Sequence, residues 1–455
     1  MKKWIGIAVV LAVVAALAVP VVNLVQGGPK KTAMATCVDP QGAAVAASLE
    51  PKCANCHAAG TPLPFYANWP IAKPMVTKDV ARGLAWADLG RELNRKAPPT
   101  VSEATLAKLE KVISQGAMPP GRFAALHWNA RLSDSETGAV LAWIREARLS
   151  RAQAGLPESV AVFVVAPIPT SVEVNAAKAA LGEKLYNDKR LSGDDTLSCA
   201  TCHDLAKGGT DNLPVSVGIR GQKGGINAPT TFNALWQVEQ FWDGRAKDLK
   251  EQAGGPPLNP IEMGATWEGV VAKLDADKAF AAEFKAVYPE GFSADSITDA
   301  IAEYEKTLST PNSRFDKFLM GQKDALSAQE VRGWTRFQEL GCATCHSGKL
   351  LGGTSFERMG REGDYFAERG NPTDADFGRF NHTKDPADRH FFKVPTLRNI
   401  ALTHPYFHDA SAPDLISAET AMAKYQTGVA LSENDAKDME AFLRSLTGEF
   451  QGRQL

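Results

Sequence analysis

The sequence has no strong excess of either charge and no low-complexity tract. Its 50 lysines and arginines nearly balance its 52 aspartates and glutamates, which gives a formal net charge of −2. A nucleic-acid partner requires a basic face, so this balance argues against one. With 44% hydrophobic and 22% charged residues, the composition is that of an ordinary globular protein. The length of 455 residues exceeds what one hydrophobic core organises, which predicts more than one domain.

Cysteine and histidine are scarce, and most of the cysteines follow one pattern. The chain has seven cysteines and eight histidines. Three C-x-x-C-H motifs occur, at 53–57, 199–203 and 342–346. In this pattern two thiols attach a c-type haem and the histidine binds its iron. One C-x-x-C alone could be a redox disulfide or half of a zinc site, but three copies with the trailing histidine favour haem.

The motifs therefore predict three covalently bound haem c groups. The attachment cysteines are Cys53, Cys56, Cys199, Cys202, Cys342 and Cys345, and the iron-binding histidines are His57, His203 and His346. The seventh cysteine, Cys37, is left without a partner for an internal disulfide, and we assign it no role.

A single long apolar run begins the chain. It extends from Trp4 to Val25 behind Lys2 and Lys3, and it is long enough to span a bilayer. The two lysines hold the start in the cytoplasm, so the rest of the chain is exported. A signal peptide cleaved near Ala18 is the alternative, but the sequence stays apolar beyond that point. We expect a single-pass inner-membrane protein whose haem domains lie in the periplasm.

The spacing of the motifs divides the chain into three comparable segments, each with helix signals. Ser327 and Glu330 form a capping box for a helix that leads into Gly341, and Ser133 and Glu136 form another. Helices are also expected over 176–186 and 436–446. We therefore predict a mainly α protein, with three cytochrome c-type haem domains in tandem behind an N-terminal transmembrane helix. The boundaries are 1–30 for the anchor, 31–155 for the first haem domain, 156–172 for a proline-containing linker, 173–325 for the second haem domain and 326–455 for the third.

The residue on the open side of each iron decides what the haem does, because His/Met ligation suits electron transfer and an open position permits chemistry. For the first haem the candidate is Met118, which two following prolines hold in place, with His127 as a rival. For the third haem Met422 has the corresponding position, and Met359 and Met439 compete with it.

From about Val174 to its end, the chain resembles the bacterial dihaem cytochrome c peroxidases. The matching strings are 197–203, 208–213 (Gly-Gly-Thr-Asp-Asn-Leu), 226–230 (Ile-Asn-Ala-Pro-Thr), 240–245 (Gln-Phe-Trp-Asp-Gly-Arg), 393–399 (Lys-Val-Pro-Thr-Leu-Arg-Asn) and 405–409 (Pro-Tyr-Phe-His-Asp). With the N-terminal run and the Met118-Pro-Pro segment included, the whole length is similar to the membrane-anchored trihaem peroxidases that use quinol as electron donor.

The resemblance implies a division of labour between the haems. The haem on His203 would reduce hydrogen peroxide, and the haem on His346 and Met422 would relay electrons to it. The donor would be quinol, a small cytochrome or a cupredoxin, acting through the haem on His57. The resemblance also implies a calcium site between the second and third haem domains. A homodimer remains an open alternative for the assembly.

The resemblance further implies roles for individual side chains. Trp242 would lie between two haems, Glu262 would be the catalytic acid/base, and Gln252 would be a polar residue of the distal pocket. A carboxylate beside an open iron suits peroxide cleavage, because a proton must move from one peroxide oxygen to the other. The structural alternatives are that Trp242 is core and Glu262 an exposed loop carboxylate. The calcium ligands would be Asn227 and the backbone carbonyls of Thr403 and Pro405.

One departure from the family pattern bears on activation. In two-haem relatives a histidine caps the peroxidatic iron, and here Ile219 takes its place. An isoleucine cannot bind iron, so the iron should be open. Two other functions compete: a pure electron carrier, and a peroxide-dependent oxidase of protein side chains. The latter would use a tyrosine on the third haem, for which Tyr425 is available.

Overall fold

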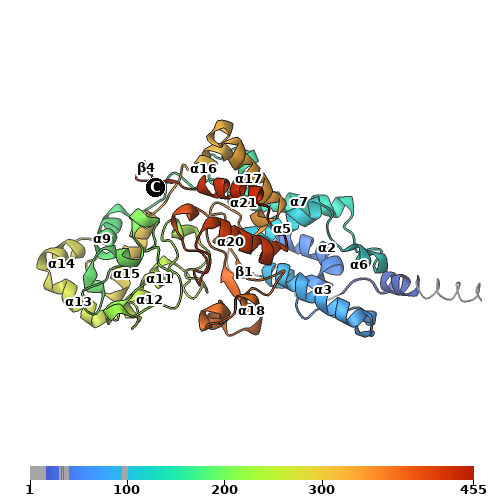
Figure 1. Ribbon diagram of the computed structural model, residues 1–455, viewed down its shortest axis with the longest axis horizontal. Coiled ribbons are helices and arrows are strands. Elements are labelled where there is room, and N and C mark those ends of the chain that lie inside the picture. Colours follow the sequence, from blue (N-terminus) through green and yellow to red (C-terminus); the bar gives the residue numbers. More distant parts are fainter. Residues whose placement is uncertain (1–16, 30–31, 33, 35–39, 95–100) are drawn as a thin grey trace, which may run out of the picture. The chain divides into compact units, whose positions relative to one another are not determined.

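The computed structural model describes residues 17–29, 32, 34, 40–94 and 101–455. The chain forms two compact units, Met1–Phe163 and Val164–Leu455, so the boundary lies within the segment expected as a linker. Helices dominate both units, as Figure 1 shows. This confirms a mainly helical protein. Cys37 and the first 16 residues of the chain lie outside the described residues.

The first unit is a set of helices around one hydrophobic core. Its core includes Leu49, Leu106, Val140 and Ile144, each at most 1% exposed. Residues 17–26 are helical as well, but no helix in the part of the chain that is described is long and apolar enough to cross a membrane. The elements are α2 (Pro40–His57), η2 (Phe65–Asn68), α3 (Ala72–Trp86), α4 (Leu89–Glu92), α5 (Glu103–Ser114), α6 (Gly121–Leu126), α7 (Asp134–Leu149) and α8 (Glu158–Ala161).

The second unit begins with the helices around the second motif. Helix α9 packs against α15, and Gly182 makes this close approach possible, because a Cβ there would lie 1.9 Å from the carbonyl oxygen of Ala300. The helices are α9 (Ala176–Tyr186), α10 (Cys199–Cys202), α11 (Leu249–Ala253), α12 (Gly255–Leu258), α13 (Trp267–Ala276), α14 (Lys278–Lys285) and α15 (Ala294–Lys306). The predicted helix over 176–186 is confirmed.

The rest of the second unit surrounds the third motif. Helix α17 starts at the expected capping box of Ser327 and Glu330, and it packs against α21. The helices are α16 (Arg314–Leu319), α17 (Ala328–Glu339), α18 (Tyr365–Arg369), α19 (Phe380–Thr383), α20 (Leu415–Met422) and α21 (Glu433–Arg444). Two short antiparallel pairs complete the unit: β1 (Phe356–Arg358) with β2 (Phe391–Lys393), and β3 (Glu449–Phe450) with β4 (Arg453–Gln454). In the first unit, helix α7 likewise starts at a capping box, the one predicted from Ser133 and Glu136.

A buried arginine fastens the start of the second unit to the third motif. Arg398 is fully buried, and its guanidinium lies 2.8 Å from the carboxylate of Asp316. It also donates hydrogen bonds to the Ser313 hydroxyl and to the backbone oxygens of Ala166 and Lys349. Because a buried charge is tolerated only when paired and hydrogen-bonded, these partners fix the loops that they belong to.

Candidate haem sites

The three motif histidines share one arrangement. Each is half-buried and pairs its Nδ1 with a backbone carbonyl oxygen: His57 with Ala87 at 3.0 Å, His203 with Gly209 at 3.3 Å and His346 with Leu351 at 3.0 Å. Burial lowers the pKa of all three imidazoles, to about 4 for His346. A neutral imidazole oriented through one nitrogen presents the other to a metal, so the motifs fit haem ligation.

The second motif opens into a cavity of about 190 Å³. Cys199, Cys202 and His203 line it, and so do all three side chains that the resemblance assigns to catalysis: Trp242, Gln252 and Glu262. Arg245 also lines the cavity. Among the lining residues that the structure describes, His203 is the only histidine, and no methionine other than Met263 is present.

Glu262 is held by the loop that follows α12. Asn259 donates a hydrogen bond from Nδ2 to the Glu262 carboxylate at 2.7 Å. The backbone oxygen of Glu262 accepts a bond from the Ile219 amide at 2.7 Å. Burial raises the pKa of the Glu262 carboxyl, although Arg245 and Asn259 oppose the shift. Glu262 is thus a half-buried, positioned carboxyl at the cavity and not a freely exposed loop residue.

Ile219 is buried in the same loop contact. Its side-chain carbons lie 3.3 Å from where a Cβ would stand on Gly264 and also on Gly193. Its neighbour Gly218 lines the cavity, and a Cβ there would lie 1.9 Å from the Ile261 oxygen. The glycine therefore lets the two loops touch, and the isoleucine fills the space behind the Glu262 loop.

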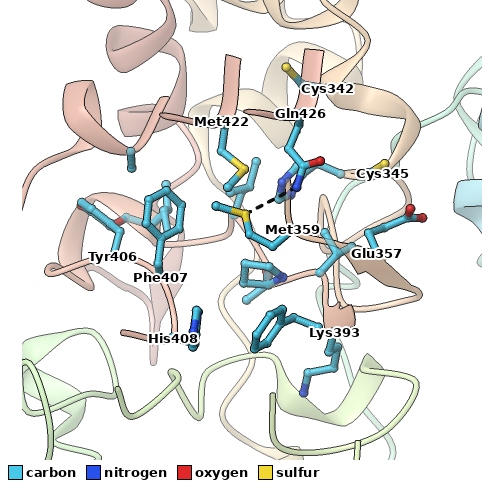
Figure 2. Close-up of a pocket in the computed structure, with 18 of the residues that line it drawn as sticks. Cys342, Cys345, Glu357, Met359, Lys393, Tyr406, Phe407, His408, Met422 and Gln426 are labelled. Atoms are coloured by element: carbon cyan, nitrogen blue, oxygen red, sulfur yellow. Dashed lines mark hydrogen bonds between the residues drawn. The ribbon is translucent and has the colours of Figure 1, made fainter. Parts of the chain in front are cut away.

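The third motif opens into a second cavity, of about 240 Å³ and mostly apolar (Figure 2). Cys342, Cys345 and His346 line it together with Met359, Met422 and Met439. Met359 and Met422 both point into the cavity in Figure 2, and the Met359 sulfur accepts a hydrogen bond from Gln426 at 3.5 Å. Met439 belongs to the hydrophobic core of α21. The cavity thus brings all three competing methionines to the third motif.

Trp242 and Lys393 are among the residues that line both cavities. The Trp242 indole donates to the backbone oxygen of Asn227 at 2.9 Å, and the backbone amide of Lys393 donates to the Trp242 oxygen at 2.8 Å. Lys393 is 4% exposed, and burial lowers its pKa to about 7. Its ammonium donates to the side chain of Gln237 and to the Glu239 oxygen. The sequence analysis did not single out Lys393 as a site residue. The only sign of its role was its place in the string 393–399, which matches the dihaem peroxidases.

The first motif lies on the last turn of α2, in the first unit. Gly83 of α3 permits close contact with it, because a Cβ there would stand 2.3 Å from the Cys56 oxygen. Met118, between α5 and α6, is 44% exposed. His127 pairs its Nε2 with the Tyr66 hydroxyl at 2.8 Å, so one of its two ring nitrogens is engaged, and Met118 stays the predicted ligand.

The three expected calcium ligands all line the cavity of the third motif. The side-chain amide of Asn227 donates from Nδ2 to the Leu213 oxygen at 2.8 Å, which leaves its Oδ1 as the outward acceptor. Thr403 and Pro405 flank His404 in a loop that Asn212 ties down through the Leu402 and His404 oxygens. Amide and carbonyl oxygens are the ligands that Ca²⁺ prefers, so this set fits the ion.

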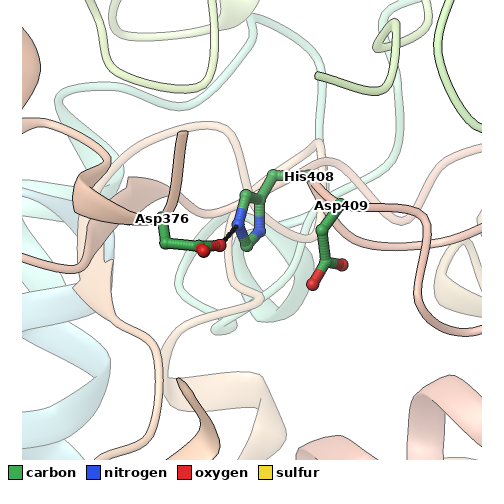
Figure 3. Close-up of side chains that lie close together, drawn as sticks. All are labelled: Asp376, His408 and Asp409. Atoms are coloured by element: carbon green, nitrogen blue, oxygen red, sulfur yellow. Dashed lines mark hydrogen bonds and ion pairs between the residues drawn. The ribbon is translucent and has the colours of Figure 1, made fainter. Parts of the chain in front are cut away.

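Asp376, His408 and Asp409 form a second group with metal-ligand chemistry, shown in Figure 3. Asp376 is fully buried and pairs with the His408 ring at 2.8 Å. Arg369 bonds both carboxylates, and Tyr365 donates to Asp409 at 3.0 Å. Burial would raise the pKa of both aspartates, but these partners hold each pKa below its usual value. The Arg369 guanidinium thus supplies, between the two aspartates, the positive charge that a bound metal ion would provide.

Known proteins place the chain in a family. A family profile described as di-haem cytochrome c peroxidase matches residues 176–324, and one described as a haem-binding domain matches residues 12–146. "Cytochrome c peroxidase Ccp" of Escherichia coli K12 is 46% identical over 407 residues, which cover 88% of this chain and 86% of that protein. The chain belongs to the di-haem cytochrome c peroxidase family. It is therefore an oxidoreductase of the cytochrome c peroxidase type.

Other relatives match nearly two thirds of the chain. "Cytochrome c551 peroxidase" of Nitrosomonas europaea is 44% identical and covers 63% of this chain and 84% of its own length. The crystal structure of a MauG-like protein associated with microbial copper homeostasis superposes with a TM-score of 0.55 at 28% identity, over 65% of this chain and 96% of that one. The fold and the family assignment therefore agree.

Proposed function

We propose that this protein reduces hydrogen peroxide to water in the cavity of His203. The observation that carries the proposal is the convergence of Glu262, Gln252 and Trp242 on that one cavity. When bound, the haem supplies an iron that accepts peroxide and exchanges electrons. Glu262 takes a proton from the near peroxide oxygen and returns it to the departing one, and Gln252 orients the substrate by hydrogen bonding.

The electron path follows from the residues between the cavities. The cavity of His346 holds a methionine ligand, for which we propose Met422, and this site relays electrons to the His203 site. Trp242 and Lys393 line both cavities, which supports a path between the two haems through the indole and past this buried lysine. The bound calcium ion would hold Asn227 to the loop of Thr403 and Pro405, and thereby fix Trp242, whose indole binds the Asn227 oxygen.

Three haems and a membrane location complete the proposal. The first unit carries the first C-x-x-C-H motif, with His57 and Met118 as the proposed iron ligands, and we assign it to electron entry. The apolar run of residues 4–25 supports a single-pass inner-membrane anchor with the haem units in the periplasm. Such a location favours a membrane quinol as donor, with a small cytochrome or a cupredoxin as the alternative.

The structure weighs against both competing functions. A pure carrier would need a second ligand for the iron at His203, and His390 and His408 are engaged with Asp376 instead. An oxidase of protein side chains would need Tyr425 on the third haem, but its hydroxyl donates to Glu368 at 3.0 Å.

Steady-state peroxide consumption tests the proposal. We expect detergent-extracted holoprotein to reduce peroxide with decylubiquinol, and with reduced cytochrome c as the comparison donor. Because Ile219 provides no imidazole to displace, the progress curve should show no lag that pre-reduction removes. Absence of turnover with every donor would sink the proposal, and turnover with cytochrome c alone would remove only the quinol.

A further inference from the structure

Five aromatic rings gather on the first unit, beside the end of α6. This aromatic cluster consists of Phe65, Tyr66, Trp69, Phe123 and His127. Phe65 and Trp69 are 42% and 49% exposed, whereas Tyr66 is buried. The centroids lie 5.6 Å apart for Phe65–Trp69, 5.7 Å for Phe65–Tyr66, 5.9 Å for Tyr66–His127 and 4.0 Å for the stacked pair Phe123–His127. Exposed aromatic surface of this kind commonly marks a ligand or membrane contact.

The aromatic cluster contains a hydrogen-bonded polar pair. The Tyr66 hydroxyl lies 2.8 Å from His127 Nε2, and Asn23 Nδ2 lies 3.5 Å from the same nitrogen. Burial lowers the pKa of His127 to about 4, so the imidazole is neutral at pH 7 and accepts the tyrosine proton. The Tyr66 oxygen keeps its lone pairs, so it can accept a hydrogen bond from a ligand hydroxyl. When a ligand hydroxyl passes its proton to the Tyr66 oxygen, Tyr66 can pass its own proton on to His127.

The same pair adjoins the first haem motif. Asn55, inside the C-x-x-C-H motif, donates from Nδ2 to the Pro62 oxygen at 3.0 Å, and Pro62 precedes the cluster's Phe65 by three residues. Arg122, at the start of α6, bonds Asp79 of α3, and a Cβ on Gly83 of the same helix would stand 2.3 Å from the Cys56 oxygen. A ligand on the aromatic cluster would therefore sit beside the haem attached at Cys56.

The aromatic cluster also continues into an apolar helix. Asn23 is buried and donates from Nδ2 to the Leu126 oxygen at 2.7 Å, which ties the helix of residues 17–26 to α6 (Figure 1). Leu17, Val21, Leu24 and Val25 on that helix are exposed. Aromatic side chains at the end of a membrane-inserted helix lie at the lipid–water boundary. A lipophilic ligand could thus reach His127 without crossing water.

We propose that the aromatic cluster is the site at which a membrane hydroquinone is bound and oxidised. The ligand ring stacks on Phe65 and Trp69, and one hydroxyl donates to the Tyr66–His127 pair. Oxidation releases two protons and two electrons; one proton is taken by the pair and the electrons pass singly to the haem attached at Cys56. With peroxide as oxidant, hydroquinone and H₂O₂ give quinone and two waters. The inference rests on the proposed quinol-dependent function and names its site.

Two variants separate this site from the peroxide chemistry. His127→Phe keeps the ring stacked on Phe123 and removes the proton acceptor, and Tyr66→Phe removes a single hydroxyl. His382→Phe, at an exposed histidine of α19, is the matched control. Peroxide turnover is measured in detergent-extracted holoprotein with decylubiquinol and with ascorbate-reduced tetramethylphenylenediamine, a water-soluble one-electron donor. The haem absorption spectrum is recorded for each variant.

We expect both variants to lower kcat/KM for decylubiquinol by about 10²-fold, the usual contribution of a positioned base. The diamine-driven rate and the spectrum should stay within twofold of the wild type, as in the control. Unchanged quinol turnover, or an equal loss with both donors, would overturn the site. A changed haem spectrum in His127→Phe would also overturn it, because His127 would then be an iron ligand. If the wild type oxidises only the diamine, the proposal of a quinol donor is wrong, whereas the proposal of peroxide reduction is retained.

Discussion

At the scale of single residues, the chemistry depends on how loops hold side chains. Glu262 is an ordinary loop glutamate in the sequence, and only the contacts of its loop with Gly218 and Ile219 turn it toward the cavity. Family resemblance predicted this residue, whereas its spacing from the C-x-x-C-H motif could not. The burial of Lys393 and Arg398 could not be predicted, because it follows from long-range packing that no local sequence pattern contains.

Replacing Glu262 by glutamine tests the acid/base. The change keeps size and polarity and removes the proton shuttle, so peroxide turnover should fall by about 10²–10⁴-fold with haem content unchanged. The raised pKa of Glu262 adds a pH signature. As a base it must be ionised, so wild-type turnover should fall as the pH drops through a value above 4.5, the ordinary pKa of a glutamate. If the glutamine variant shows the same fall in turnover at low pH, that fall is caused by another ionisable group.

The methionines can be assigned by substitution. Met422→Ala should convert the third haem from a low-spin His/Met form to a higher-spin form, because the thioether ligand is lost. Met359→Ala, in the same cavity, is the matched control and should leave the spin state unchanged. Met118→Ala should act likewise on the first haem. Low-temperature electron paramagnetic resonance distinguishes the forms, and a reversal between Met359 and Met422 would exchange their roles.

At the scale of elements, helix boundaries were predictable and loop networks were not. The capping boxes at Ser133 and Ser327 mark helix starts that local chemistry alone determines. The network of Arg369, Asp376 and Asp409 joins α18 to loops that are distant in sequence. Each of its members is an ordinary charged residue until the fold buries it, so no local pattern predicts the group.

Breaking this network should destabilise the second unit. Arg369→Leu leaves the buried Asp376 without its guanidinium partner, which should lower the free energy of unfolding by about 3–5 kcal/mol. Arg332→Leu, in a surface pair with Asp438, should cost much less, because water screens an exposed ion pair. Guanidinium denaturation at pH 7 gives both values. Equal losses in the two variants would show that the network contributes no more than a surface pair.

The pH dependence of that loss has a definite sign. The folded-state pKa values of Asp376 and Asp409 are lowered, so their contribution is present above the ordinary value of 3.8 and disappears as the pH falls through the lower folded values. The stability difference between wild type and Arg369→Leu should therefore shrink below pH 3.8. We expect it to stay constant from pH 5 to pH 7.

At the scale of the whole molecule, the motif count leads to a stoichiometry. The di-haem peroxidase profile matches residues 176–324, which contain the second motif, and the chain carries one further motif on either side of that stretch. Intact-protein mass spectrometry should therefore show three haem additions per chain, in protein recovered from the membrane fraction. Cys53→Ala/Cys56→Ala should remove one haem and leave the other two. A wild-type mass with two additions would mean that the first motif is not a haem site.

The central claim is that the second unit performs peroxide chemistry and does not merely carry electrons. Stopped-flow spectroscopy of the fully reduced holoprotein, mixed with one equivalent of hydrogen peroxide, tests it most directly. Since peroxide takes two electrons to become water, two haems per chain should be reoxidised within a single rapid phase, and Glu262→Gln should slow that phase. If all the haems stay reduced after mixing, the protein is an electron carrier and the account is contradicted.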